Sequence, residues 1–433
     1  MTVKIGLLGL GTVGSGTVEI LQDPQGRSPL LKAIEVKAVG VRSLDKPRQV
    51  NLPPEVLTTD LEAIVTDPDI AIVVELMGGL EPARSLILQA IAHKKHIVTA
   101  NKAVIARYGP EIYEAANQHG VYVLLEAAVG GGIPIIKPLK QSLGGNRIQS
   151  IVGILNGTTN YILSRMTSEG ADFDEVLTAA QQLGYAEADP SADVDGLDAA
   201  DKIAILASLG FGGRVKREDV ACEGIRSVSA VDIAYADRLG FVIKLLAIAD
   251  GNAGEDSEAL QLRVHPTLIA KDHPLASVNG VYNGVLVTGD PLGQVMFYGR
   301  GAGAGPTASA VVSDVINIVG IITSSDENPA LDPLLSCTHQ HYCQVSPIED
   351  LVTRFYCRFL CADVPGVIGH LGMGFGNHGV SLESLVQIGF TDGCAEIVVV
   401  THDVREGDYR AALEEISQLE AVKEIPSVIR VLS

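Results

Sequence analysis

The stretch VKIGLLGLGTVGSGTVEIL, residues 3 to 21, decides how the chain begins to fold. A strand-like apolar run leads into Gly9, Gly11 and Gly14, spaced G-x-G-x-x-G, and a helix-compatible segment follows. In a dinucleotide-binding turn these glycines allow the tight turn, the approach of a pyrophosphate and close helix–strand packing. Thr12 and Val13 would open the helix, whose N-terminal N–H groups attract phosphate. The alternative is a glycine turn that is only structural.

The end of the second expected strand indicates which dinucleotide would bind. This strand, residues 34 to 41, is followed by Arg42, and no carboxylate stands at its tip. An Asp or Glu there binds the ribose 2′-OH of NAD, whereas an Arg accommodates the 2′-phosphate of NADP. We therefore expect NADP as the cofactor, with NAD as the second option. The alternative is that Arg42 belongs to an ordinary basic loop.

Length and charge narrow the class of protein. The 433 residues suffice for two or three domains, and 47% hydrophobic with 19% charged residues is a globular composition. The net charge of −20 argues against nucleic acid and anionic membranes as partners, because both attract basic surfaces. No apolar run approaches the length of a membrane span, no signal peptide is recognised, and the six cysteines are scattered. We expect a cytoplasmic protein.

The first third of the chain predicts an α/β fold. Besides residues 34 to 41, apolar runs occur at 70–78, 95–101 and 121–128, with helix-like segments between them. Strands that are apolar throughout are typical of a parallel sheet covered on both faces. Residues 1 to 135 are therefore predicted to form a Rossmann-type doubly wound domain.

The middle third predicts an α+β domain that binds substrate and forms a dimer, residues 136 to 304. Strands are expected at 148–157, 260–269 and 283–292, and helices at 158–167, 174–183, 196–209 and 231–238. A glycine-rich turn near residue 300 then opens a long apolar helix, residues 307 to 322. Either residues 305 to 325 return to complete the nucleotide domain, or this turn is a tight crossing between domains.

The last part of the chain predicts a linker and a small third domain. Residues 326 to 351 are polar and contain proline, as linkers do. Residues 352 to 433 follow the order βαββαβ, which is typical of a ferredoxin-like module. Within the linker, Cys337, His339, His341 and Cys343 are possible metal ligands, but zinc sites usually pair C-x2-C or H-x3-H spacings from two segments, so we favour a plain linker.

The densest group of polar residues lies between positions 184 and 210. Asp198 and Lys202 are four residues apart, so both lie on one face of the expected helix, and that face then becomes apolar. This pattern indicates a site, although a surface ion pair has the same spacing. Upstream, Glu187, Asp193 and neighbouring acids would hold the ammonium group of an amino-acid substrate or a cation, or would simply be solvated.

Two further positions are candidates for chemistry. Lys102 follows an expected strand at the carboxyl edge of the parallel sheet, where catalytic groups collect, or it is a surface lysine that opens a helix. Glu126 precedes a glycine run that exposes backbone carbonyl groups, and a carboxylate with several carbonyls is a ligand set for a hard cation.

Six ordered motifs resemble the homoserine dehydrogenase family. They are GLGTVGSG, ANKAVIA, EAAVGGGIPI, GILNGTTNYIL, GYAEADPSADVDGLDAADKIAIL and GRGAGAGPTAS, and the resemblance covers essentially residues 1 to 322. The tail, with CADVPGVIGHLG, is similar to an ACT domain, an amino-acid-sensing module.

The resemblance implies a role for each candidate. Lys202 would exchange the proton at the carbonyl of aspartate semialdehyde, with Lys102 assisting at cofactor and substrate. Position 201 is Asp, whereas many relatives carry Arg there, and the negative charge of Asp201 would act on the neighbouring Lys202. The implied homoserine-binding residues are Glu187 and Asp198, supported by Asp193. Glu126 and the backbones of Val129, Gly131 and Ile133 would match a monovalent-cation site, which is expected to bind Na⁺. Gly184, Gly303 and Gly305 would contact the nicotinamide side of the cofactor.

The resemblance also implies regulation and assembly. A free amino acid, expected to be L-threonine, would bind the tail around Asp363, Pro365, Gly366, Asn377 and Gln387. ACT modules commonly bind it between two paired copies, so we expect a homodimer or homotetramer. The alternative function is a non-catalytic amino-acid sensor that keeps the folds, and the presence of both Lys102 and Lys202 argues against it.

Overall fold

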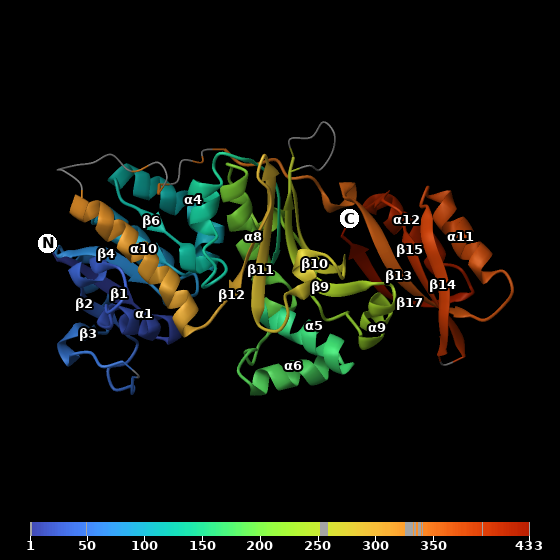
Figure 1. Cartoon of the computed structure of the whole chain (residues 1–433), viewed down its shortest axis with the longest axis horizontal. Coiled ribbons are helices and arrows are strands. Elements are labelled where there is room, and N and C mark those ends of the chain that lie inside the picture. Colours follow the sequence, from blue (N-terminus) through green and yellow to red (C-terminus); the bar gives the residue numbers. More distant parts are fainter. Residues whose placement is uncertain are drawn as a thin grey trace. The chain divides into compact units, whose positions relative to one another are not determined.

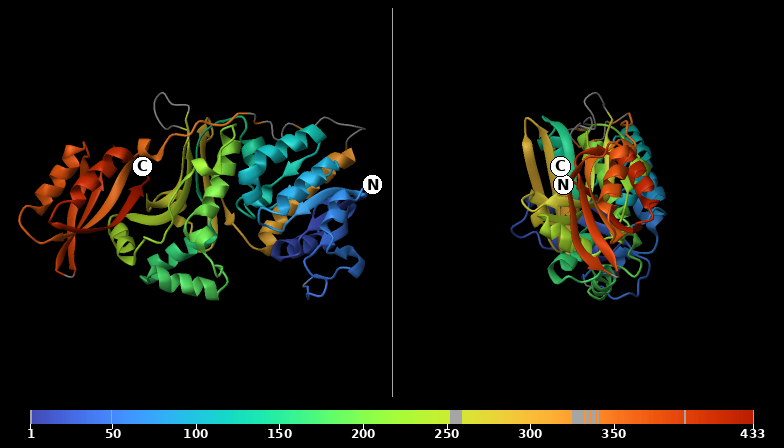
Figure 2. Two further views of the ribbon diagram at one scale, coloured as in Figure 1. Left: turned by 180° about the vertical axis from the view of Figure 1, so that it is seen from behind. Right: turned by 90° about the vertical axis from the view of Figure 1, so that its right-hand side faces the viewer.

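The computed structural model describes residues 2–48, 50–251, 259–324, 332, 335–336, 339, 341–391 and 393–432. The chain divides into two compact units. Unit 1 comprises Met1–Ile148, Asp201–Arg217 and Gly289–Cys343, and unit 2 comprises Gln149–Ala200, Glu218–Thr288 and Gln344–Ser433. Figures 1 and 2 show the elements of each unit.

Unit 1 is built on a six-stranded parallel sheet in the order β3-β2-β1-β4-β5-β6. This doubly wound order confirms the Rossmann-type prediction. The strands are β1 (Val3–Leu8), β2 (Ile34–Gly40), β3 (Leu57–Thr58), β4 (Ile70–Glu75), β5 (His96–Thr99) and β6 (Val123–Leu124). The connecting helices are α1 (Thr12–Gln22), α2 (Leu61–Thr66), α3 (Ala83–Ala92) and α4 (Lys102–His119).

The helix α10 (Ala304–Ser324) follows strand β12 (Gly293–Arg300) and packs beside α1 (Figure 1). A Cβ added at Gly16 of α1 would lie 2.8 Å from the carbonyl oxygen of Ala304, so the two helices approach closely. Contrary to the expectation from sequence, α10 is long and apolar enough to cross a membrane. Half of it is buried, however, and Val311, Val315 and Ile318 belong to the core of the parallel sheet, so its apolar composition is that of a core helix.

Unit 2 combines helices with a mixed sheet. The predicted helices are present as α5 (Gly157–Glu169), α6 (Phe173–Gln182) and α9 (Ala230–Arg238), while α7 (Ser191–Val194) is an additional short helix. The predicted strands are β7 (Arg147–Ile154), β10 (Gln261–Ala270) and β11 (Tyr282–Asp290). Strand β9 (Phe241–Asp250), which was not anticipated, lies between β7 and β10, and the short β8 (Ala221–Cys222) pairs with β10. The fourth predicted helix is α8 (Leu197–Gly210), which begins in unit 2 and continues into unit 1.

The tail has the predicted βαββαβ order. It contains β13 (Val352–Ala362), α11 (Val367–Asn377), β14 (Leu382–Thr391), β15 (Cys394–Thr401), α12 (Glu406–Ser417) and β17 (Val422–Val431), with the two-residue β16 (Val404–Arg405) paired to β13. The antiparallel order β17-β13-β15-β14 confirms the ferredoxin-like prediction. Its core includes stacked rings of Phe355 and Tyr409, with centroids 3.9 Å apart.

The tail sheet is continuous with the sheet of the middle domain. Strand β17 pairs in parallel with β10, where Thr267 opposes Arg430 and Leu268 opposes Val431. The backbone N–H of Leu432 also donates to the carbonyl of Leu268, at 2.9 Å. The two parts of unit 2 therefore share backbone hydrogen bonds.

Candidate functional site

The glycine-rich loop of unit 1 has the geometry of a dinucleotide turn. Gly9 has a φ of +110°, which favours glycine, and a Cβ there would lie 2.9 Å from the carbonyl oxygen of Leu76. At Gly14 a Cβ would lie 2.3 Å from the carbonyl oxygen of Gly9, whereas at Gly11 it would meet no described atom within 4 Å. Gly11 is the N-cap of α1, and no side chain caps this helix by a hydrogen bond. No cap side chain therefore covers the first N–H groups of the helix, which begin at Thr12 and Val13. These residues fit the pyrophosphate of a dinucleotide.

The carboxyl ends of β1, β2, β4 and β5 meet at one edge of the parallel sheet. Hydrogen bonds from Gly9 N to Gly40 O (3.0 Å) and from Leu76 N to Leu8 O (2.9 Å) join the loops that leave these strands. Arg42 lies two residues beyond β2 and is exposed. Lys102 is the first residue of α4, whose N-cap is Asn101. Arg42 and Lys102 thus leave the same edge as the glycine loop.

Glu75 at the end of β4 is a residue of this edge that the sequence analysis missed. Its carboxylate is fully buried and accepts hydrogen bonds from Thr99 Oγ1 (2.7 Å) and from the backbone N–H groups of Met77 (2.8 Å) and Gly78 (3.3 Å). Burial raises the pKa of Glu75. The sequence could have indicated Glu75 as a buried polar residue, because it is an acidic residue inside the apolar run IVVELMGG. Its contacts hold the loop that precedes α3.

Glu126 makes different contacts from those expected of a cation ligand. Its Oε1 accepts from the backbone N–H groups of Ile135 (2.8 Å) and Ile136 (2.9 Å), and its Oε2 accepts from that of Lys137 (2.9 Å). Both carboxylate oxygens therefore anchor the start of a helical turn. The backbone N–H of Glu126 donates to the buried Asp314, whose pKa is raised to about 6 by burial. Among the described residues no group of three or more His, Cys, Asp or Glu side chains has the geometry of a metal site.

The glycine run after Glu126 packs against the segment before α10. A Cβ at Gly131 would lie 2.4 Å from the carbonyl oxygen of Gly301, and the N–H of Gly132 donates to Arg300 O at 3.1 Å. Val129 and Ile133 are buried beside it. Gly303 has a φ of +123°, and Cβ atoms at Gly305 and, in unit 2, at Gly184 would meet no described atom within 4 Å.

Helix α8 carries Lys202 one turn after Asp198, and both side chains are buried. The neighbouring Asp201 forms ion pairs with Arg217 (3.1 Å) and Arg107 (3.5 Å). Its negative charge, which the sequence analysis noted as a departure, is therefore shared between two guanidinium groups.

The acidic residues before and at the start of α8 make different contacts. Asp193 and Asp198 both accept hydrogen bonds from the side-chain amide of Asn156, at 2.7 and 2.8 Å. Asp195 instead pairs with Arg226 at 2.5 Å. Glu187 is exposed, and its backbone carbonyl accepts from Gln181 at 3.1 Å. Asn156 was missed, although it lies in the quoted motif GILNGTTNYIL.

The candidate ligands between residues 337 and 343 are only partly described, because Cys337 lies outside the described residues. The backbone of residues 341 to 343 runs beside Arg214, which exchanges hydrogen bonds with His341 O (2.7 Å) and Cys343 N (2.8 Å).

The ACT-like tail contains a cavity of about 150 Å³. It brings together three of the predicted effector residues, Asp363, Gly366 and Gln387, and Pro365 lies in the same turn. Asn377 is not among the lining residues. It ends α11 and donates to Glu415 of α12 at 2.8 Å.

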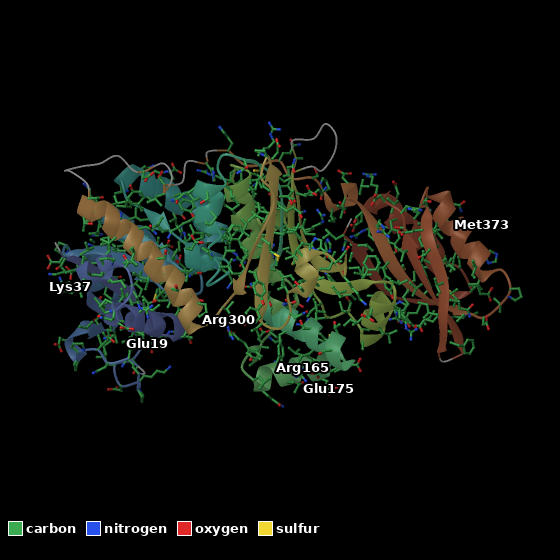
Figure 3. The ribbon with its side chains drawn as sticks, in the orientation of Figure 1. Glu19, Lys37, Arg165, Glu175, Arg300 and Met373 are labelled. Carbon is green, nitrogen blue, oxygen red and sulfur yellow. The ribbon has the colours of Figure 1, made fainter. Side chains whose placement is uncertain are left out.

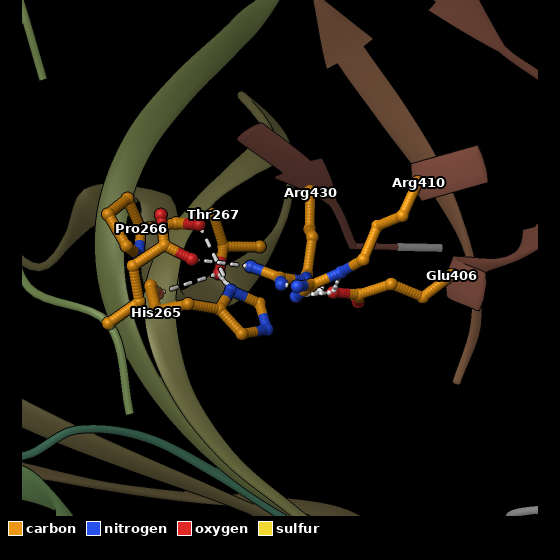
Figure 4. A network of polar contacts seen from close by, with 7 residues as sticks. His265, Pro266, Thr267, Glu406, Arg410 and Arg430 are labelled. Atoms are coloured by element: carbon orange, nitrogen blue, oxygen red, sulfur yellow. Dashed lines mark hydrogen bonds and ion pairs between the residues drawn. The ribbon is translucent and has the colours of Figure 1, made fainter. Parts of the chain in front are cut away.

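Two ion-pair clusters join the tail to the middle domain within unit 2; the second is buried, and in the first Glu223 is partly exposed. In the first, Arg430 of β17 donates to Glu406 (2.8 Å) and to Glu223 (2.8 Å), and it lies beside His265 (Figure 4). Burial holds the pKa of His265 well below its ordinary value, so this ring is neutral. In the second, Arg358 pairs with Asp232 at 2.8 Å and with Glu396 at 3.0 Å.

A doubly wound sheet with an open glycine loop, in a chain that also carries a carboxylate and a lysine one turn apart on a helix, defines a nicotinamide-dependent oxidoreductase. Three family models match the chain: "Homoserine dehydrogenase, NAD binding domain" over residues 9–126, "Homoserine dehydrogenase" over 134–316 and "ACT domain" over 355–421. The chain belongs to the homoserine dehydrogenase family and is an oxidoreductase that acts on a CH–OH group.

Relatives match over nearly the whole chain. It is 41% identical to the homoserine dehydrogenase of Bacillus subtilis, covering 99% of this chain and 98% of that one, and 41% identical to that of Corynebacterium glutamicum, covering 99% and 95%. A homoserine dehydrogenase structure from Thiobacillus denitrificans superposes with a TM-score of 0.92 at 42% identity, covering 100% and 99% of the two chains. A hyperthermophilic archaeal homoserine dehydrogenase in complex with NADPH has a TM-score of 0.62 at 29% identity, covering 73% and 97%.

Proposed function

We propose that this enzyme interconverts L-aspartate 4-semialdehyde and L-homoserine with NADPH as its preferred cofactor, and that L-threonine inhibits it through the tail. The observation that carries the catalytic part is the face of α8, where buried Asp198 precedes buried Lys202 by one turn. A carboxylate that binds the substrate and a lysine that exchanges a proton are thereby set on one rigid element.

In this proposal each side chain has a separate task. When bound, the nicotinamide supplies or accepts the hydride at C4 of the substrate. Lys202 donates the proton to the carbonyl oxygen during reduction and removes it from the hydroxyl group during oxidation, and Lys102 assists. Glu187 and Asp198 bind the polar groups of homoserine, and Asp193 supports Asp198 through their shared contact with Asn156.

The preference for NADPH rests on Arg42. It is exposed just beyond β2, where a guanidinium group pairs well with a 2′-phosphate. The glycines of the loop, at positions 9, 11 and 14, would receive the pyrophosphate, and Gly184, Gly303 and Gly305 are proposed for the nicotinamide side. The archaeal relative in complex with NADPH supports this cofactor.

A monovalent cation is proposed only with main-chain ligands. The three backbone N–H groups on the Glu126 carboxylate make it an anchor for residues 135 to 137. A bound Na⁺ would therefore use the carbonyl oxygens of Val129, Gly131 and Ile133, and no catalytic step depends on it.

The proposed effector site is the cavity lined by Asp363, Gly366 and Gln387. A carboxylate, an amide and the backbone of a glycine turn suit the ammonium and carboxylate groups of a free amino acid. Helix α11 exposes Ile368 (49% exposed) and Met373 (62% exposed; Figure 3), and such apolar exposure supports a homodimer or homotetramer.

The test is the rate of NADPH oxidation with aspartate semialdehyde. Lys202→Ala should lower kcat by about 10²-fold or more, because general acid–base groups contribute at least that much, while the Kd for NADPH stays within threefold. Lys271→Ala, at a half-exposed surface lysine, is the matched control and should keep the wild-type rate. Retention of more than about a tenth of kcat in Lys202→Ala would remove this lysine from the proposed role. A wild-type chain without turnover would favour the non-catalytic sensor.

A further inference from the structure

We propose that Asn156 is a positioning residue that holds the carboxylates of Asp198 and Asp193 in register for the substrate. The inference rests on the proposed function, because it takes Asp198 to be a substrate-binding group. Asn156 follows β7 and caps α5, with a buried side chain that is only 5% exposed.

Every hydrogen-bonding group of the Asn156 side chain is used. Its Nδ2 donates to Asp193 Oδ1 at 2.7 Å and to Asp198 Oδ2 at 2.8 Å. Its Oδ1 accepts from the backbone N–H of Thr159 at 2.9 Å and from Thr159 Oγ1 at 3.1 Å. Turning the amide over would aim its oxygen at two carboxylates and its N–H groups at a donor, so a single orientation is stable.

The two carboxylates need this donor because they carry like charges. Each lies within 2.8 Å of the same amide nitrogen, and Asp198 is only 8% exposed. Without the two N–H groups the carboxylates would repel one another in a region where solvent screens weakly. Asp198 would then change rotamer and no longer be aligned for the substrate.

The backbone next to Asp193 is also fixed by packing. The carbonyl of the next residue, Val194, accepts from the N–H of Ile225 at 2.8 Å, and a Cβ at Gly224 would lie 2.2 Å from that carbonyl oxygen. The short helix α7 that carries Asp193 is therefore held by backbone packing. Asn156 links this fixed helix to Asp198 at the start of α8.

The test separates the donor role of Asn156 from its capping role. Asn156→Ser and Asn156→Asp both keep an oxygen that caps α5, but neither supplies two N–H groups to the carboxylates. We expect the KM for homoserine to rise about tenfold in Asn156→Ser and about a hundredfold in Asn156→Asp, which adds a third negative charge. The Kd for NADPH should stay within twofold in both variants.

The control is Asp60→Ala, which removes the cap of α2 in unit 1, where Asp60 accepts from Ala63 N at 2.9 Å. It should leave the KM for homoserine unchanged. A double-mutant cycle adds a readout that a general loss of stability would not change: the effect of Asn156→Ser on KM should shrink at least threefold in an Asp193→Asn background.

Two outcomes separate this inference from the proposed function. If Asp198→Asn raises the KM for homoserine but Asn156→Ser leaves it within twofold of wild type, the positioning role is wrong. If Asp198→Asn itself has no effect, the proposed substrate site is wrong. Should Asn156→Asp fail to fold, the neutral Asn156→Ser variant decides the question alone.

Discussion

Replacing Arg358 by methionine should weaken the attachment of the tail sheet to α9. Arg358 donates to Asp232 at 2.8 Å and to Glu396 at 3.0 Å, and the exposed fractions of the three side chains are 9%, 0% and 6%. Methionine has a similar length but no charge, so both carboxylates would stay buried without their cation. Breaking a buried ion pair from one side typically costs about 3–5 kcal/mol. That free energy corresponds to roughly a 150- to 5,000-fold increase in local opening.

Amide hydrogen exchange followed by mass spectrometry measures this opening directly. Peptides from β13 and β15, which carry Arg358 and Glu396, should exchange faster by about 2.2 to 3.7 orders of magnitude. The matched control is Arg354→Met on the same strand, because Arg354 pairs with Glu383 at side chains that are 23% and 41% exposed. Such a partly exposed pair contributes about 0–1 kcal/mol, so its loss should accelerate exchange less than about tenfold.

The comparison between the two variants tests whether burial determines how much an ion pair contributes to stability. Equal acceleration in Arg358→Met and Arg354→Met would show that burial of the Arg358 cluster does not determine its contribution. Adding Asp232→Asn and Glu396→Gln to Arg358→Met should recover part of the loss, because the uncompensated charges are then removed.

Three further predictions concern the cofactor, pH and the effector. Arg42→Ala should raise the KM for NADPH about tenfold or more while that for NADH changes less than twofold, and equal losses would show that Arg42 does not recognise the 2′-phosphate. Burial lowers the pKa of His96 from 6.5 to about 4. Between these two pH values the imidazole is therefore neutral in the folded protein but binds a proton in the unfolded chain. The stability that this group contributes is present above pH 6.5 and is lost as the pH falls toward 4. Over that range the free energy of unfolding of the wild type should fall by up to about 3 kcal/mol more than that of His96→Gln. If denaturant unfolding curves show the same pH dependence for both proteins, the prediction is wrong. Asp363→Asn should raise the threonine concentration for half-inhibition at least tenfold in steady-state assays, whereas a wild-type enzyme without any threonine response would contradict the proposed effector.

Local patterns explain what could be predicted before the structure. The G-x-G-x-x-G spacing depends on residues within one turn, and apolar runs report burial on both faces of a sheet, so β1, α1 and the doubly wound order followed from the sequence. The same holds for Asp198 and Lys202, because four residues on a helix always return to one face. Strand β9 was missed since its continuous apolar run stands beside helical signals and periodicity alone does not separate the two.

The sequence by itself determined the glycine turn, the order of elements in the tail and the placement of Asp198 and Lys202 on one helix face, since each depends on neighbours along the chain. The tertiary structure alone decided three contacts between distant residues. Asn156 reaches Asp193 and Asp198 from 37 and 42 positions away, β17 continues the sheet beside β10, and the Glu126 carboxylate closes on the N–H groups of residues 135 to 137. A buried polar group must find a hydrogen-bond partner, and which partner it finds depends on how the whole chain packs, not on its sequence neighbours.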